Sequence, residues 1–166
     1  ISSPLFSGRH RMDENGAFML IKLLGRFPLV DASGPEMDQA EQVTYLNDLC
    51  LIAPAALVHA PLSWETIDDR TVKVTLSQYS YHVSAILSFG EKGELINFVS
   101  YDRFSTPDGR NPKNYPWSTP VENYMLWEGL NIPGLAKAIW HYPEGDHCYA
   151  KFRVGTFVSN PKRPLF

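Results

Sequence analysis

Cysteine is scarce in this chain of 166 residues, which contains only Cys50 and Cys148. Two cysteines define neither a disulfide framework nor a cysteine-based metal pattern. One lies in an expected helix and the other in an expected strand, so we interpret both as buried free thiols that pack like small hydrophobic residues. Folding should need no disulfide and no metal, because a domain of this length buries about two-thirds of its unfolded surface.

Long apolar runs and an excess of positive charge are also absent. The longest apolar stretches, around 17–24 and 49–58, are too short and too interrupted to cross a bilayer, so we expect no transmembrane segment in this chain. The formal net charge is −3, which is the wrong sign for general binding to nucleic acid or to an anionic membrane. We therefore predict no nucleic-acid partner.

The chain starts at Ile1, without an initiating Met or a charged-then-apolar leader. This beginning suggests a processed or trimmed product. The compartment is therefore left open, with the cell envelope expected if an upstream export or membrane segment has been removed.

Catalytic and cofactor motifs are missing as well. The chain has no Gly-x-Ser-x-Gly elbow, no phosphate-binding glycine loop and no dinucleotide fingerprint. His141, Glu144, Asp146 and His147 gather around an expected hairpin, but their spacing matches no established zinc pattern and is typical of a solvated turn. We predict no catalytic residue, no metal site and no cofactor.

What the chain does have is a packed globular composition, 44% hydrophobic and 20% charged, with apolar and polar residues alternating along much of its length. Val72, Val74 and Leu76 alternate with polar residues, Tyr81 to Phe89 shows the same period, and Gly90 to Gly93 is a turn signal. Further strands are expected at 17–30 (bent at Gly25), 62–67, 94–104, 117–128, 132–142 and 148–159. Short turns between them predict antiparallel pairing of neighbours.

One helix is expected between Gly34 and Leu57. Asp38 and Glu41 have the spacing of an N-cap and its capping-box partner. The apolar residues that follow recur every three or four positions and form one stripe: Val43, Leu46, Leu49, Cys50, Ala53 and Leu57. Pro54 should end or kink this helix near Ala53.

These elements predict a mainly β (α+β) fold in one domain that covers residues 1–166. A sheet of about eight antiparallel strands accumulates twist and tends to curl. Curling around the single helix would bury the apolar stripe and the apolar face of the sheet together. We therefore expect a strongly curved sheet, or open half-barrel, packed around one kinked helix.

The segment IKLLGRFPLVDASGPEMDQAEQVTYLNDLCLIAPAAL (21–57) resembles an uncharacterised, largely bacterial family known only as a domain of unknown function. The matching elements are Leu24–Gly25 with Pro28, Gly34 to Asp38, Tyr45–Leu46, and Pro54 with Ala56–Leu57. The resemblance implies additional strands upstream, so that this chain would be the C-terminal two-thirds of a longer half-barrel protein. The order of strands and turns is also similar to lipoprotein-localisation factors, which implies an open half-barrel with an apolar cavity for an acyl chain.

Aromatic side chains on the expected strands are the best candidates for a binding site, since they combine large apolar faces with polar tips. They could equally be cross-strand pairs that stabilise a twisted sheet. The predicted ligand-binding residues are Tyr81, Tyr101, Trp117, Tyr124, Trp127 and Trp140 on the sheet, and Leu46, Cys50 and Leu57 on the helix. Arg103 and Arg110 are candidates for contact with an anionic head group.

The sequence thus favours a non-catalytic binding or carrier-like domain for a hydrophobic or lipid-like ligand. One alternative is a small-molecule enzyme that uses Glu36 or Asp38 as acid and base in an apolar cleft. The structural reading of both carboxylates is that they stabilise the start of the helix. Another alternative is a protein-interaction domain, with homodimer formation through an exposed edge strand at 152–158 or beside 17–24.

Overall fold

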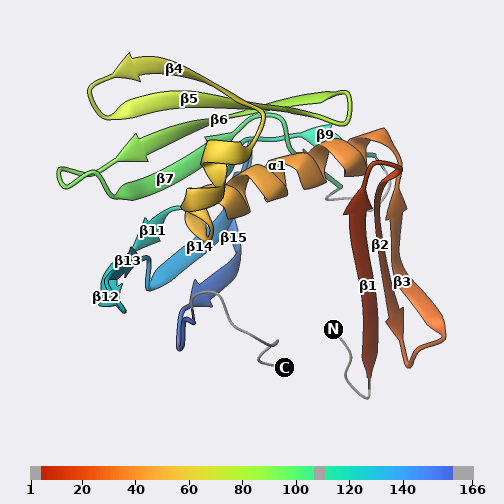
Figure 1. The fold of residues 1–166 in the computed structure, drawn as a ribbon. Helices are drawn as coiled ribbons and strands as arrows, with labels where there is room; N and C mark the ends of the chain where they lie inside the picture. Colours follow the sequence, from red (N-terminus) through yellow and green to blue (C-terminus); the bar gives the residue numbers. More distant parts are fainter. Residues whose placement is uncertain (1–4, 107–110, 159–166) are drawn as a thin grey trace.

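The computed structural model describes residues 5–106 and 111–158 (Figure 1). Within these ranges it has one α-helix, α1 (Pro35–Leu51), one 3-10 helix, η1 (Pro54–His59), and fifteen strands. The strands are β1 (Phe6–Asp13), β2 (Gly16–Leu23), β3 (Phe27–Ser33), β4 (Leu62–Asp68), β5 (Thr71–Gln78), β6 (Tyr81–Phe89), β7 (Leu95–Ser100), β8 (Phe104–Ser105), β9 (Lys113–Asn114), β10 (Trp117–Ser118), β11 (Val121–Glu122), β12 (Met125–Trp127), β13 (Leu130–Ile132), β14 (Leu135–Tyr142) and β15 (Gly145–Arg153).

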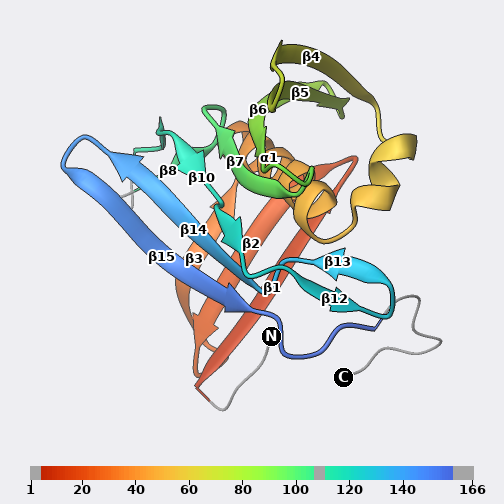
Figure 2. The same cartoon turned by 90° about the vertical axis from the view of Figure 1, so that its left-hand side faces the viewer.

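An eight-stranded antiparallel sheet forms the main body of the protein. Its order is β11-β14-β10-β7-β6-β5-β4, and β15 pairs with β14. Figure 2 shows the sheet curling from β4 round to β15, with α1 on its concave side. The sheet does not close into a barrel. The predicted fold, a curved and open antiparallel sheet around a single helix, is confirmed.

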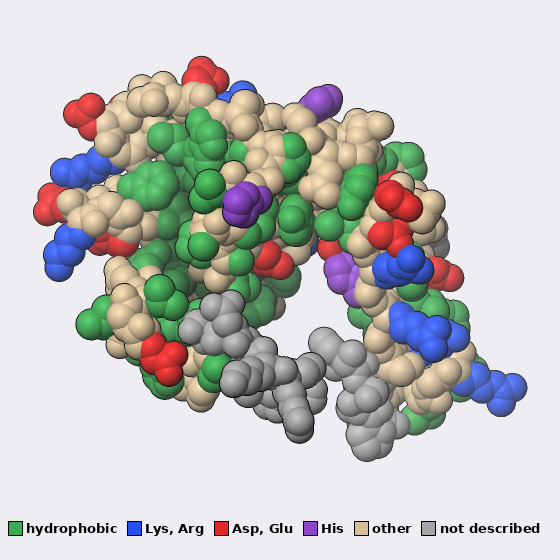
Figure 3. Space-filling model, in the orientation of Figure 1, with side chains coloured by type: hydrophobic (Ala, Val, Ile, Leu, Met, Phe, Trp, Pro, Cys, Tyr) green, Lys and Arg blue, Asp and Glu red, His purple; other side chains and the backbone are tan. Residues whose placement is uncertain are grey.

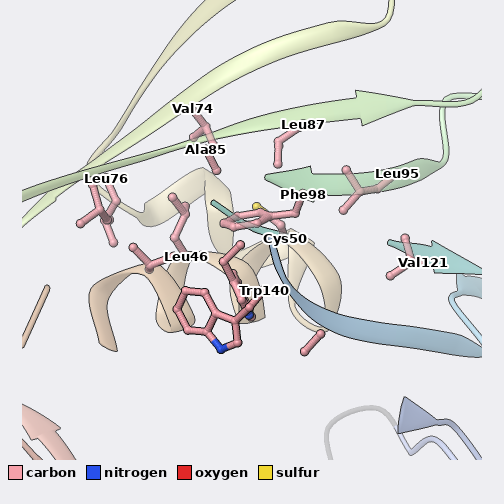
Figure 4. Packing of buried hydrophobic residues seen from close by; sticks show 14 residues of the cluster. Leu46, Cys50, Val74, Leu76, Ala85, Leu87, Leu95, Phe98, Val121 and Trp140 are labelled. Carbon is pink, nitrogen blue, oxygen red and sulfur yellow. The ribbon is translucent and has the colours of Figure 1, made fainter. Parts of the chain in front are cut away.

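The hydrophobic core lies between α1 and this concave face. Val43, Leu46 and Cys50 of the helix pack against inward-facing residues of the sheet, among them Phe98 and Trp140 (Figure 4). Alternation on the strands decides which residues face the helix: Val74 and Leu76 are fully buried, whereas Lys73 and Ser77, which flank them, are exposed. The predicted alternation of buried and exposed residues along this strand is confirmed.

A separate three-stranded sheet, β1-β2-β3, stands at the N-terminal end of α1. The prediction of one bent strand over 17–30 is wrong, because Leu24 and Gly25 both adopt left-handed backbone angles (φ 53° and 67°) and turn the chain back on itself. The strand β1 was not predicted. Since β2 is paired on both sides, 17–24 offers no free edge, contrary to the expectation.

The helix starts and ends differently from its prediction. Gly34 is the N-cap and Pro35 the first helical residue, so Asp38 does not cap the helix as predicted. The helix ends at Leu51, and Pro54 opens η1, which confirms the predicted break. The end of the predicted stripe leaves the core, since Ala53 is exposed and Leu57 is half-buried.

Two further expectations needed correction. The strand predicted over 117–128 is divided into β10, β11 and β12, with Pro120 between the first two and Asn123 in a left-handed conformation (φ 58°) before the third. Both cysteines are free, but only Cys50 is buried, because Cys148 lies on the edge strand β15 and is exposed. Burial raises the pKa of the Cys50 thiol to about 12, which fits a packing role.

A candidate ligand-binding groove

An apolar groove of about 270 Å³ lies between the C-terminal half of α1 and the strands β10, β14 and β15. The helix contributes Leu51 and, just after it, Ile52 to one wall. The other wall is formed mainly by apolar and aromatic side chains of the sheet and the chain that follows it: Trp117, Ile132, Pro133, Ala136, Ala138, Tyr149, Phe152, Val154 and Phe157. Figure 3 shows that α1 also spans a wide hollow, between this main body and the three-stranded sheet.

Arg103, from the segment after β7, is fixed inside this groove. Its guanidinium carbon lies 4.3 Å from the ring centroid of Trp117 and 5.1 Å from that of Trp140. Its Nη1 donates to the Tyr149 hydroxyl (3.0 Å), and its Nη2 donates to the Thr44 hydroxyl (3.2 Å). Its Nε is buried and has no hydrogen-bond partner within the described part of the chain. A single cation is thus held between the aromatic wall and the helix.

The charge of Arg103 acts on two carboxylates of α1, Glu41 and Asp48. Glu41 is buried and lies 2.8 Å from the His10 Nε2 of β1. Burial raises the pKa of Glu41, and the charges of His10 and Arg103 act in the opposite direction. Asp48 lines the groove one helical turn from Thr44; the surrounding protein raises its pKa by desolvation, and Arg103 opposes that rise.

A buried hydrogen bond joins the helix to the sheet beside the groove. The Asn47 side-chain amide donates to the Thr119 hydroxyl at 2.5 Å, and both residues line the groove. Because this bond links α1 to the chain just after β10, it fixes the separation of the two walls. The groove is therefore part of the packed structure and not a gap between loose segments.

The predicted ligand-binding residues are scattered over the molecule, and only one of them lines this groove. That residue is Trp117. Trp140 does not line the groove, but its ring contacts the Arg103 guanidinium and stacks on the Tyr149 ring. Leu46 and Cys50 are buried in the core, and Leu57 packs against its margin.

The other predicted aromatics lie elsewhere. The Tyr124 hydroxyl donates to the Leu95 carbonyl (2.7 Å), Tyr101 is exposed, and Trp127 is half-buried in the β12–β13 hairpin. Tyr81 lines a second, more polar pocket. Of the two predicted arginines, Arg103 lies in the groove, and Arg110 lies outside the described residues.

The second pocket, of about 440 Å³, lies where the β1–β2 and β5–β6 turns meet the first turns of α1. Asp38 is its central residue: its carboxylate accepts hydrogen bonds from the Ala17 backbone N–H (2.6 Å) and from the Tyr81 hydroxyl (3.0 Å). Glu36 is exposed and does not line this pocket. The two carboxylates proposed as an acid–base pair are therefore not brought together here.

A row of three polar side chains on the opposite face of the sheet has the hydrogen-bond order of a catalytic triad. The Ser118 hydroxyl lies 2.8 Å from His141 Nε2, and His141 Nδ1 lies 2.6 Å from Asp146 Oδ1. Ser118 is only 3% exposed, however, and neither it nor His141 lines the groove or the polar pocket. We interpret the row as cross-strand hydrogen bonding. Among the described residues, no three His, Cys, Asp or Glu side chains are placed to hold a metal ion.

Sequence reasoning missed Asp48, Tyr149 and Phe152 as groove residues. Asp48 did carry a signal, because an acidic residue in the last turn of a helix opposes the helix dipole. Tyr149 is one of the strand aromatics but was not among the predicted site residues, and neither it nor Phe152 could be placed on the groove side, because their side of the sheet depends on a bulge in β15 that shifts the register after Ala138.

Together these features define a mainly β domain in which an open antiparallel sheet packs on one helix and leaves an apolar groove beside it. The chain belongs to a family of unknown function, DUF6544, whose family model matches residues 2–152. No curated protein and no solved structure matches the chain. In the parts of the chain that the structure describes, no helix is long and apolar enough to cross a membrane.

Proposed function

We propose that this protein is a non-catalytic binding or carrier domain for a hydrophobic or lipid-like ligand, which it holds in the groove between α1 and the concave face of the sheet. The observation that supports this function is the groove itself. Its walls are mainly apolar, it lies beside the core, and Arg103 places a polar group within it. Small-molecule sites have this composition, with a few fixed polar groups in an apolar lining.

The size of the groove favours a narrow ligand. Its volume of about 270 Å³ lies just below the range of roughly 300–1,000 Å³ that small-molecule sites occupy. A single acyl chain fits this volume better than a two-chain lipid or a folded cofactor. We therefore propose a ligand with one apolar chain.

Native mass spectrometry of the protein purified from cells tests this proposal. We expect an adduct of a few hundred daltons that is lost on mild activation or on extraction with organic solvent. The variant Ala136→Trp fills the groove and should lose the adduct, whereas Ala55→Trp adds the same bulk on the exposed surface of η1 and should keep it. An unliganded wild type that also fails to take up added single-chain amphiphiles would refute the proposal.

A second candidate function, protein interaction through an edge strand, rests on β4. Among the described strands β4 pairs only with β5, and its Trp64 and Ile67 side chains are each 51% exposed. An exposed strand edge with apolar side chains can pair with a strand of another chain. Light scattering after size exclusion should then detect a dimer that Thr66→Pro abolishes; a monomer at all concentrations would remove this candidate.

A further inference from the structure

The groove contains two opposite charges that do not neutralise each other by contact. Of its three charged lining residues, Lys137 is paired outside the groove, with its Nζ 3.0 Å from the Glu122 carboxylate. Asp48 and Arg103 remain, and they interact through space rather than by a salt bridge. Their charges sum to zero. A ligand with a charged head group would therefore bring an uncompensated charge into an apolar site, which is costly.

Both groups retain hydrogen-bonding capacity. A guanidinium has five N–H donors, and Arg103 uses one at Nη1 and one at Nη2 for its bonds to Tyr149 and Thr44. Asp48 has four lone-pair positions, and its side chain receives no hydrogen bond from the described residues. The groove thus offers donors on one side and acceptors on the other.

The position of Asp48 is unfavourable for the helix alone. It lies in the last turn of α1, where a negative charge meets the negative end of the helix dipole, and this turn has no basic residue to offset it. Its side chain lines the groove but remains exposed to solvent. A charge that opposes the helix dipole and receives no hydrogen bond from the described residues does not stabilise the helix, and it is free to bind a ligand.

We infer that the groove selects an uncharged single-chain amphiphile with a hydroxylated head group, which donates hydrogen bonds to Asp48 and accepts them from Arg103. This inference rests on the proposed function, because it assigns the polar end of the ligand to the same groove. A head group of this kind, such as that of a monoacylglycerol, can both donate and accept without changing the net charge of the site. The carboxylate of a fatty acid would be repelled by Asp48, and the ammonium group of an alkylammonium would be repelled by Arg103.

Three ligands of equal chain length test the selection by displacement of the uncharged fluorophore N-phenyl-1-naphthylamine from the wild type. They are monolauroylglycerol, laurate and dodecylammonium, all used below their micellar concentrations. We expect monolauroylglycerol to displace the fluorophore at about tenfold lower concentration than either charged ligand, since one charged hydrogen bond or its loss corresponds to roughly a factor of ten.

The variant Asp48→Asn makes the lining net positive and should shift the ratio of laurate to monolauroylglycerol affinity about tenfold towards laurate. The control is Asp69→Asn, which removes the same charge from an exposed turn between β4 and β5 and should leave the ratio unchanged. Thermal melts show that each variant is folded before it is titrated.

The outcomes separate the two proposals. If all three ligands bind the wild type equally, or laurate binds best, the groove is a binding site and the selection inferred here is wrong. The same conclusion follows if Asp48→Asn leaves the laurate ratio unchanged. If neither the fluorophore nor any of the three ligands binds, the proposed function itself fails.

Discussion

The guanidinium carbon of Arg103 lies 4.3 Å from the ring centroid of Trp117, so that a cation after β7 covers the face of an aromatic residue in β10. A cation–π contact of this kind contributes about 0.5–2 kcal/mol, depending on how far water is excluded. The same tryptophan forms part of the groove wall, and its indole N–H donates to the Tyr149 hydroxyl (3.2 Å) that also receives Arg103. One residue therefore supports both the packing of the sheet and the shape of the groove.

Replacement of Trp117 by Leu should lower the free energy of unfolding by about 3 kcal/mol, through lost aromatic burial and the lost cation–π contact. The variant should also bind N-phenyl-1-naphthylamine more weakly. Urea denaturation and fluorophore titration provide the two measurements. The matched control is Trp64→Leu on the exposed strand β4, where a change within about 0.5 kcal/mol is expected. Equal losses at the two positions would contradict this account of Trp117.

The strand β7 offers a second matched comparison, between a buried and an exposed side chain. Phe98 is fully buried against α1, whereas Ile96, which a bulge leaves without a partner in β6, is 43% exposed. Phe98→Ala should lower the free energy of unfolding by about 3–5 kcal/mol and Ile96→Ala by about 1 kcal/mol or less. Similar values for both variants, measured by urea denaturation, would mean that the sheet does not bury the face described.

Asp38 should hold the three-stranded sheet to the main body. Its carboxylate accepts hydrogen bonds from Ala17 of β2 and from Tyr81 of β6. Asp38→Ala leaves both donors unpaired and should cost about 1–3 kcal/mol, while Tyr81→Phe removes only one bond and should cost about 1 kcal/mol. Amide hydrogen exchange should accelerate at Ala17 in the first variant and stay slow in the second. Unchanged exchange in Asp38→Ala would contradict this role.

Substitution of Asp48 by Asn should stabilise the folded protein, by an amount that depends on pH. Because its pKa is raised in the folded protein, the ionised form opposes folding. The stability linked to the protonated form is complete below the ordinary pKa of 3.8 and is lost as pH rises through the elevated folded value. Asp48→Asn should therefore melt at a higher temperature than the wild type at pH 7, and the difference should disappear near pH 3.

Comparison with the variant at each pH is needed because Glu41 acts in the same direction. Its pKa is also raised, chiefly by burial, so the wild type alone would report both carboxylates. His10 and Arg103 are common to the two proteins; Asp48→Asn also removes the repulsion that raises the pKa of Glu41, and this contribution adds to the difference in the same direction. A difference in melting temperature that stays constant from pH 3 to pH 7 would show that Asp48 is not perturbed by the groove.

The Ser118–His141–Asp146 row should not be reactive. Nucleophilic attack requires that the serine oxygen reach a carbonyl or phosphoryl centre, and Ser118 is 3% exposed. We expect no labelling of the folded protein by a fluorophosphonate probe. Peptide mass spectrometry that located the probe on Ser118, with labelling abolished in His141→Ala, would show that this protein is an enzyme instead.

The local features of the fold could be predicted from the sequence because their causes are local. The alternation in β5 and β6, the glycine-containing turn before β7, and the break at Pro54 each depend on neighbouring residues. The hairpin between β2 and β3 could not, since 17–30 is almost continuously apolar and its turn begins at Leu24, a residue that rarely adopts a positive φ.

The candidate site was less predictable because it depends on contacts between distant parts of the chain. Residue type identified Trp117, but type alone also selected Tyr124, which bonds to the backbone at Leu95, and Tyr101, which is exposed. The groove exists because the end of α1 lies opposite β14 and β15, about a hundred residues later. No local pattern specifies that juxtaposition or the bulge that turns Tyr149 towards Arg103.

The central claim is that the groove holds an apolar ligand, and titration of N-phenyl-1-naphthylamine into delipidated protein tests it most directly. We expect a saturable rise in fluorescence with one site per chain for the wild type and for the surface variant Ala55→Trp, and loss of this rise in Ala136→Trp. Binding of equal strength and stoichiometry in Ala136→Trp, folded by its thermal melt, would contradict the claim.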